Sequence, residues 1–147
     1  MMNNYVATPL LVCEVIQEAQ KKKKKDAKIK VLKDNESWAL KDVLRGSYDM
    51  TVKWNVPDSK PPYTPNLGQS SPSNLLKLNR QFRFFVQGGE GDAMQKFKRE
   101  RLFIELLESI DPEDAELVCG MIAKKEIKGV KREVVEEAFP GLLLDAQ

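Results

Sequence analysis

The sequence predicts an all-α protein, a compact bundle of about six or seven helices with one long proline-rich irregular loop at residues 49–72. Three observations support this fold class. Apolar residues recur at spacings of three and four in several segments. Residues typical of helix caps and turns separate those segments. Five of the eight prolines lie between residues 57 and 72. With 147 residues, the chain is expected to form a single domain, residues 1–147.

Three helices are predicted in the first fifty residues. Thr8 is expected to cap the first helix, with Pro9 at its first position and its end near residue 20 or within the lysines that follow. Asp26 is expected to cap a short second helix that ends near residue 32. A third helix over about residues 36–44 is expected to bury four apolar side chains: Trp38, Leu40, Val43 and Leu44.

The middle of the chain changes character twice. Residues 50–54 alternate between apolar and polar, as a strand does. In the loop that follows, Tyr63 and Leu67 are expected to pack on the core. Ser73 is then expected to cap a helix with an apolar face at Leu75, Leu78, Phe82 and Phe85. Another face of that helix carries a row of basic residues: Lys77, Arg80 and Arg83.

Two further helices and a short last one complete the prediction. Gly88 and Gly89 end the preceding helix and begin a flexible acidic tip at residues 90–92. The next helix spans about residues 93–110. Asp111 followed by Pro112 starts a helix that runs to about residue 125. After a turn at Gly129, the last helix covers residues 131–138.

The composition argues against several kinds of chemistry. The sequence has no histidine, which removes Ser-His and Cys-His nucleophile systems and histidine-ligated zinc. The two cysteines are expected to be reduced core thiols, and no signal peptide or long apolar run is found, so a cytoplasmic protein is expected. A glycine-rich stretch at residues 88–91 lacks the pattern of a P-loop. We therefore expect no enzyme, no cofactor and no resident metal.

An acidic group near the middle of the chain has two interpretations. Its carboxylates could hold a cation, or they could form a solvated helix face and cap, which we favour. The residues are Glu105, Glu108, Asp111, Glu113 and Asp114.

The net charge of +2 is the sum of segregated regions of opposite sign. Residues 20–33 hold eight lysines and one acid, whereas residues 102–119 hold six acids and no base. The run Lys21, Lys22, Lys23, Lys24 and Lys25 exceeds what a helix terminus needs. Nucleic-acid phosphate is its favoured partner, and a solvated face or an acidic protein are the alternatives.

A second basic group surrounds the predicted turn at Gly129. It consists of Lys124, Lys125, Lys128, Lys131 and Arg132. These side chains could bind phosphate, or they could solvate the corner between two helices. Both basic groups are candidate nucleic-acid-binding residues.

Several segments resemble the N-terminal DNA-binding domain of ATP-dependent DNA ligases of T-even phages. The segments that carry the resemblance are Lys125-Glu126-Ile127-Lys128-Gly129-Val130, Ala138-Phe139-Pro140-Gly141-Leu142, residues 29–36 and residues 40–48. The chain is also similar to small uncharacterised proteins of T4-like marine phages, in its Pro-Pro-Tyr-Thr-Pro loop at residues 61–65 and in residues 99–109.

The ligase resemblance implies an all-helical module that grips the duplex backbone across the minor groove, largely without base readout. On matching positions, the implied contacts are Lys124, Lys125, Lys128 and Lys131. The Lys-x-Asp-Gly motif of ligation is missing, so the resemblance implies binding of double-stranded DNA without catalysis. A phage role in replication, repair or transcription in the host cytoplasm is expected.

The sequence is also compatible with two other functions. The acidic face at residues 105–116 and the proline-rich loop with Tyr63 are also typical of an adaptor that docks on a replisome or polymerase protein. A minor virion or assembly protein is the third possibility. The sequence does not determine the oligomeric state, and it indicates no membrane association.

Overall fold

A computed structural model shows an all-α fold and describes residues 9–68 and 73–145. Those residues form seven α-helices, two 3₁₀ helices and no strand. The prediction of an all-α helical bundle is therefore confirmed. Within the same residues, no helix is long and apolar enough to span a membrane.

The first three helices are α1 (Val12–Lys21), α2 (Lys25–Asp34) and α3 (Trp38–Tyr48). Helix α1 begins three residues later than predicted, because the Glu14 carboxylate accepts a hydrogen bond from the Leu11 backbone N–H at 2.7 Å and marks the first turn. Pro9 therefore precedes the helix, and the predicted cap Thr8 lies outside the described residues. Helix α3 has an N-cap at Ser37, whose hydroxyl accepts a hydrogen bond from the Leu40 N–H at 3.0 Å.

The middle of the chain differs most from the prediction. The one helix predicted after Ser73 is replaced by α4 (Leu75–Leu78) and the 3₁₀ helix η1 (Asn79–Phe84). A second 3₁₀ helix, η2 (Glu90–Ala93), lies at the predicted acidic tip. Phe82 and Phe85 still reach the core, because a spacing of three residues keeps them on one side of a 3₁₀ turn. The N-cap is Asn74 instead of Ser73.

Residues 90–92, predicted to form a flexible acidic tip, belong to the hydrogen-bonded 3₁₀ turn η2. Gly91 is buried in η2, where an added Cβ would lie 1.8 Å from the Phe84 carbonyl oxygen. The Arg99 guanidinium donates hydrogen bonds to the carbonyls of Gly91 and Met94, each at 3.1 Å. These bonds fix the turn against the next helix.

The last three helices are α5 (Lys96–Ser109), α6 (Pro112–Ile122) and α7 (Arg132–Ala138). Helix α6 starts as predicted, since the Asp111 carboxylate accepts a hydrogen bond from the Glu113 N–H at 2.8 Å and Pro112 takes the first helical position. Helix α5 begins later than predicted because residues 90–93 belong to η2.

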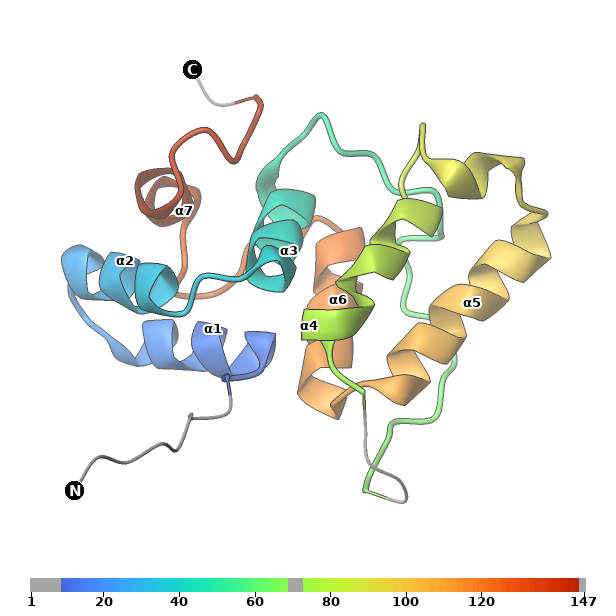
Figure 1. Ribbon diagram of the computed structural model, residues 1–147, viewed down its shortest axis with the longest axis horizontal. Coiled ribbons are helices and arrows are strands. Elements are labelled where there is room, and N and C mark those ends of the chain that lie inside the picture. Colours follow the sequence, from blue (N-terminus) through green and yellow to red (C-terminus); the bar gives the residue numbers. More distant parts are fainter. Residues whose placement is uncertain (1–8, 69–72, 146–147) are drawn as a thin grey trace, which may run out of the picture.

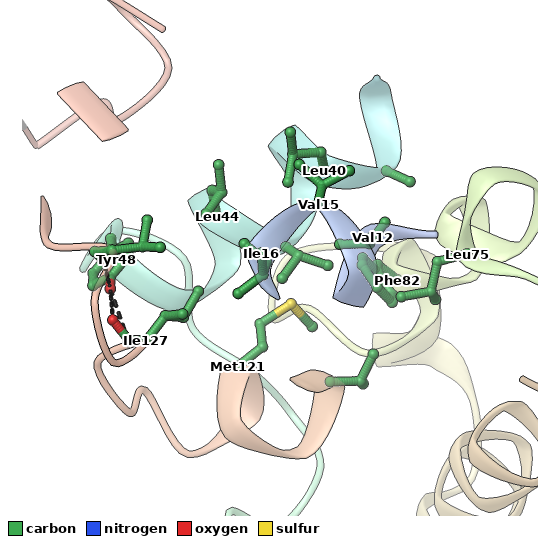
Figure 2. Packing of buried hydrophobic residues seen from close by; sticks show 14 of the residues in the cluster. Val12, Val15, Ile16, Leu40, Leu44, Tyr48, Leu75, Phe82, Met121 and Ile127 are labelled. Atoms are coloured by element: carbon green, nitrogen blue, oxygen red, sulfur yellow. Dashed lines mark hydrogen bonds between the residues drawn. The ribbon is translucent and has the colours of Figure 1, made fainter. Parts of the chain in front are cut away.

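The elements are arranged with α3 and α6 at the centre (Figure 1). Helices α1, α2 and α7 pack together on one side, and α4, η1 and α5 lie on the other. Buried apolar side chains from α1 to the C-terminal segment form one core cluster. Figure 2 shows residues of α1 facing Leu40 and Leu44 of α3 and Met121 of α6.

The proline-rich loop is irregular over its described residues and lies against α5 and α6. The Tyr63 hydroxyl donates a hydrogen bond to the Glu116 carboxylate at 3.0 Å, and the Thr64 N–H donates to Glu108 at 2.7 Å. Leu67, however, is 72% exposed and does not anchor the loop. The strand-like pattern before the loop yields only an isolated antiparallel bridge between Trp54 and Val86.

Trp38 was expected in the core, but its side chain is 74% exposed. It is the first residue of α3, and the neighbouring Ala39 takes the buried position instead. The Lys41 ammonium lies 4.9 Å from the centre of the Trp38 ring, in a cation–π contact.

Two helical glycines provide a test of packing at the centre of the fold. A Cβ on Gly46 would lie 2.5 Å from Trp54 Cζ2 and 2.7 Å from Met121 Sδ, whereas a Cβ on Gly120 would meet open space. We expect Gly46→Ala to lower the free energy of unfolding by about 1–3 kcal/mol through overpacking. The matched Gly120→Ala should raise it by up to about 1 kcal/mol. Chemical denaturation measures both, and equal effects would contradict the packing argument.

Candidate nucleic-acid interface

The first lysine run joins α1 to α2. Lys21 ends α1, Lys25 begins α2, and all five lysines of the run are exposed. The Lys21 ammonium lies 3.0 Å from the Glu18 carboxylate on the same helix. Lys25 is turned toward α7, where it pairs with Glu133 and Glu137, and the hydrogen bond to Glu137 raises the pKa of Lys25.

The second basic group begins at Lys124, whose ammonium points into the protein. It donates hydrogen bonds to the Gly46 and Asp49 carbonyl oxygens at 2.7 and 2.8 Å, and burial lowers the pKa of Lys124. The backbone of Lys124 has a φ of 56°, a left-handed conformation that glycine usually occupies after a helix. Its side chain therefore stabilises the end of α3, so we do not count Lys124 as a surface contact.

Tyr48 holds the turn that follows. Its hydroxyl accepts a hydrogen bond from the Ile127 N–H at 2.8 Å and donates one to the Val130 carbonyl oxygen. Figure 2 shows Tyr48 beside Ile127. Burial raises the pKa of this phenol. The Tyr48 hydroxyl thus satisfies two backbone groups of residues 124–131 from the end of α3.

Arg132 is also engaged within the protein. Its guanidinium donates to the Tyr48 carbonyl oxygen at 2.8 Å and to Glu136 at 2.9 Å, and it pairs with Asp145. The hydrogen bonds to Asp145 and Glu136 raise the pKa of Arg132. The predicted DNA-binding role of Arg132 would require its guanidinium to leave these partners.

A buried carboxylate completes the end of α3. Asp49 is fully buried, and burial by itself would raise its pKa. Hydrogen bonds from the Thr51 hydroxyl at 2.7 Å and from the Leu144 N–H at 2.8 Å outweigh that effect and lower the pKa. Asp49 therefore attaches the C-terminal segment to α3 in its ionised form.

The structure brings the two basic groups together. The Gln20 amide donates a hydrogen bond to the Lys128 carbonyl oxygen at 2.8 Å, and the Lys28 ammonium donates to the Gly129 carbonyl oxygen at 2.6 Å. Gly129 has a φ of 79°, and an added Cβ would lie 3.3 Å from Gln20 Cγ. The α1–α2 connection and the turn before α7 are therefore adjacent.

This adjacency defines a basic surface that we call the junction lysines. The junction lysines are Lys21, Lys22, Lys23, Lys24, Lys128 and Lys131. All six are exposed, and among the described residues Lys21 is the only one of them with an ion pair. Lys125 is exposed as well, but we leave it out of the junction lysines because its charge acts on Glu116. The hydrogen bond from Lys60 is the main cause of the lowered pKa of Glu116, and the charge of Lys125 lowers that pKa further. Lys28 is one of the eight lysines of residues 20–33 but not one of the predicted contacts, and its hydrogen bond to the Gly129 carbonyl oxygen joins the two segments.

The acidic residues have structural partners. Glu108 binds the proline-rich loop, Asp111 caps α6, and the fully buried Asp114 accepts a hydrogen bond from the Cys13 N–H at 2.8 Å. Burial raises the pKa of both Asp114 and the Cys13 thiol. Within the described ranges, the possible metal ligands that lie together are Cys13, Asp111 and Glu113. The capping bond of Asp111 and the Gln17 amide on Glu113 account for this grouping.

The fold and this surface define a class of protein: an all-α domain with exposed lysines gathered at one helix junction. The chain belongs to a protein family of unknown function, DUF6433, whose profile matches residues 15–128. The match covers most of α1, all of α2 to α6 and the turn as far as Lys128. Comparisons with curated proteins and with solved structures find no match.

Removal of the Tyr48 hydroxyl should loosen the basic turn. Tyr48→Phe leaves the buried Ile127 N–H without a partner, so we expect the free energy of unfolding to fall by about 1–3 kcal/mol. In the matched control Tyr63→Phe, the lost partner is an exposed carboxylate, and the effect should stay below about 1 kcal/mol. Urea titration compares the two variants, and a larger loss in Tyr63→Phe would contradict this role of Tyr48.

Asp49 should make the free energy of unfolding depend on pH in the acidic range. Its folded-state pKa lies below the ordinary 3.8, so its contribution is present above that value and is lost as pH falls through the folded-state pKa. The unfolding free energy of the native protein should therefore fall more steeply below about pH 4 than that of Asp49→Asn. Denaturation at a series of pH values checks this, with Asp58→Asn in the exposed loop as control. Parallel curves for the native protein and Asp49→Asn would refute it.

Proposed function

We propose that the protein binds the backbone of double-stranded DNA through the junction lysines, without reading bases and without catalysing a reaction. The observation that carries the proposal is the pair of hydrogen bonds from Gln20 and Lys28, which bring Lys128 next to the lysine run. Six exposed lysines from two distant segments then flank one junction. Clustered lysines attract phosphate through counterion release, which requires no particular base sequence.

The rigidity of the turn supports this interpretation. Tyr48, Lys124 and Arg132 hold the backbone of residues 124–132 from inside the protein. Lys128 and Lys131 are therefore carried by a fixed backbone, and less conformational entropy is lost on binding than from a free tail. The carboxylates of α7 border the surface on one side and neutralise Lys25.

The resemblance to the DNA-binding domain of phage ligases supports the same function. Of the contacts that it implies, Lys128 and Lys131 belong to the junction lysines, and Lys125 is exposed beside them in sequence. The ammonium of Lys124 is engaged with α3. A role in phage replication, repair or transcription, in the host cytoplasm, fits this resemblance.

The adaptor function has less support. Its two motivating features, the proline-rich loop and the acidic face, bind one another through Tyr63, Thr64 and Lys60. Neither feature is therefore unpartnered on the surface. A docking partner would have to displace these bonds or use another face.

Charge reversal tests the proposed interface. We expect the logarithm of DNA affinity to fall linearly with the logarithm of salt concentration for the native protein. Lys22→Glu combined with Lys128→Glu should weaken binding to two duplexes of unrelated sequence equally, and each lost phosphate contact should lower the slope by about 1. The control Lys96→Glu with Lys98→Glu alters two exposed lysines of α5, on the far side in Figure 1, and should have a smaller effect.

Two results would overturn phosphate binding through the junction lysines. One is undetectable duplex binding at about 50 mM salt, where phosphate contacts are strong. The other is an equal loss of affinity in the α5 control, which would show that net charge alone governs binding. Unequal affinity for the two duplexes would contradict the absence of base readout. The same series with an RNA duplex decides between the two nucleic acids, and tighter binding of RNA would overturn the assignment to DNA.

A further inference from the structure

A pocket between α3 and η1 has the size of a small-molecule site. Its volume is about 330 Å³, within the range of roughly 300–1,000 Å³ that ligand pockets occupy. One part of its lining is apolar and partly aromatic: Val52, Trp54, Phe82 and Val86. None of the junction lysines lines the pocket, so an inference about it does not rest on the proposed function.

Three arginines line the same pocket. Arg80 and Arg83 come from η1, and a 3₁₀ helix has three residues per turn, so their side chains leave the helix on one side. Arg45 comes from α3, and its Nε atom is buried without a hydrogen-bond partner. The nearest carboxylate oxygen, of Asp49, lies 3.7 Å from this Nε. The Nε atom is therefore enclosed beside Asp49, whereas 42% of the Arg45 side chain is exposed and the residue lines the pocket.

The acidic groups around the pocket leave it cationic. Asp42 is the one carboxylate in the lining, and it accepts a hydrogen bond from the Asn79 amide at 2.8 Å. Glu90 lies 3.4 Å from Arg83, but both side chains are more than half exposed, and such pairs contribute little. The lining therefore holds three guanidinium groups and one carboxylate, while Asp49 lies against Arg45 from outside the lining.

We propose that this pocket binds a nucleoside monophosphate, with its phosphate on the arginines and its base against the apolar wall. Guanidinium groups form paired hydrogen bonds to phosphate oxygens, which suits the cluster of three. Inorganic phosphate would leave the wall formed by Val52 and Trp54 uncovered, whereas a planar base covers it. Beyond the hydrogen bond that joins them, Asp42 keeps a second carboxylate oxygen and Asn79 a second amide hydrogen for the polar edge of the base.

The indole of Trp54 provides the readout. The chain has two tryptophans, so Trp38→Phe, at an exposed position, leaves Trp54 as the only indole. Adenosine 5′-monophosphate should change the Trp54 emission and bind at least about tenfold more tightly than adenosine or inorganic phosphate, since each of these lacks one half of the contacts. Calorimetry on the native protein checks the affinities. Equal affinity for phosphate and the nucleotide, or no nucleotide binding, would overturn the proposal.

The basic row noted in the sequence supplies a matched control. Arg80→Glu should lower nucleotide affinity by about tenfold or more, because a charge-assisted contact becomes a repulsion. Lys77→Glu makes a similar charge reversal three residues earlier, at an exposed position outside the pocket lining, and should leave the affinity unchanged. Equal losses in the two variants would contradict a site at this pocket. Arg80 is exposed, so thermal unfolding should confirm that its variant folds.

Discussion

The hydrogen bonds at the C-terminal end of α3 are the constraint on which the rest of the structure depends. A helix ends with carbonyl groups that have no partner within the helix, and cations are favourable there. Lys124 and Arg132 donate to three carbonyl oxygens of this end, across sequence separations of 75 to 84 residues. The Asp49 carboxylate holds the C-terminal segment against α3 by accepting a hydrogen bond from the Leu144 N–H. Residues 46–49 thus connect α3 with the last quarter of the chain.

This connection determines where the junction lysines lie. Tyr48 fixes the backbone on both sides of Lys128, and the adjacent α1–α2 connection meets it through Gln20 and Lys28. The basic residues of the turn therefore divide into two functions. Lys124 and Arg132 use their charges to stabilise the fold, while Lys128 and Lys131 leave theirs in solvent. Substitution of the first pair reports on stability, and substitution of the second pair reports on binding.

Helix α3 also forms one wall of the pocket that Arg45, Arg80 and Arg83 line. Gly46 lets the Trp54 ring approach the helix backbone, and the indole N–H donates to the Gly46 carbonyl oxygen at 3.0 Å. That same carbonyl oxygen accepts a hydrogen bond from Lys124. The end of α3 is therefore shared by the basic turn and by the aromatic wall of the pocket, although the two surfaces use different side chains to meet a ligand.

Local sequence determined most of the helices and much of the core, because spacing, capping and proline act within a few residues, as the start of α6 at Asp111 and Pro112 shows. The local pattern wrongly predicted that Trp38 is buried, since a residue at the first position of a helix can face solvent even when its type favours burial. It also missed the 3₁₀ helices, because an apolar spacing of three suits either helix type. The sequence by itself therefore determined an all-α fold with two basic segments. Only the tertiary structure decided which lysines remain in solvent, because partners such as Gly46 and Asp49 lie far away along the chain.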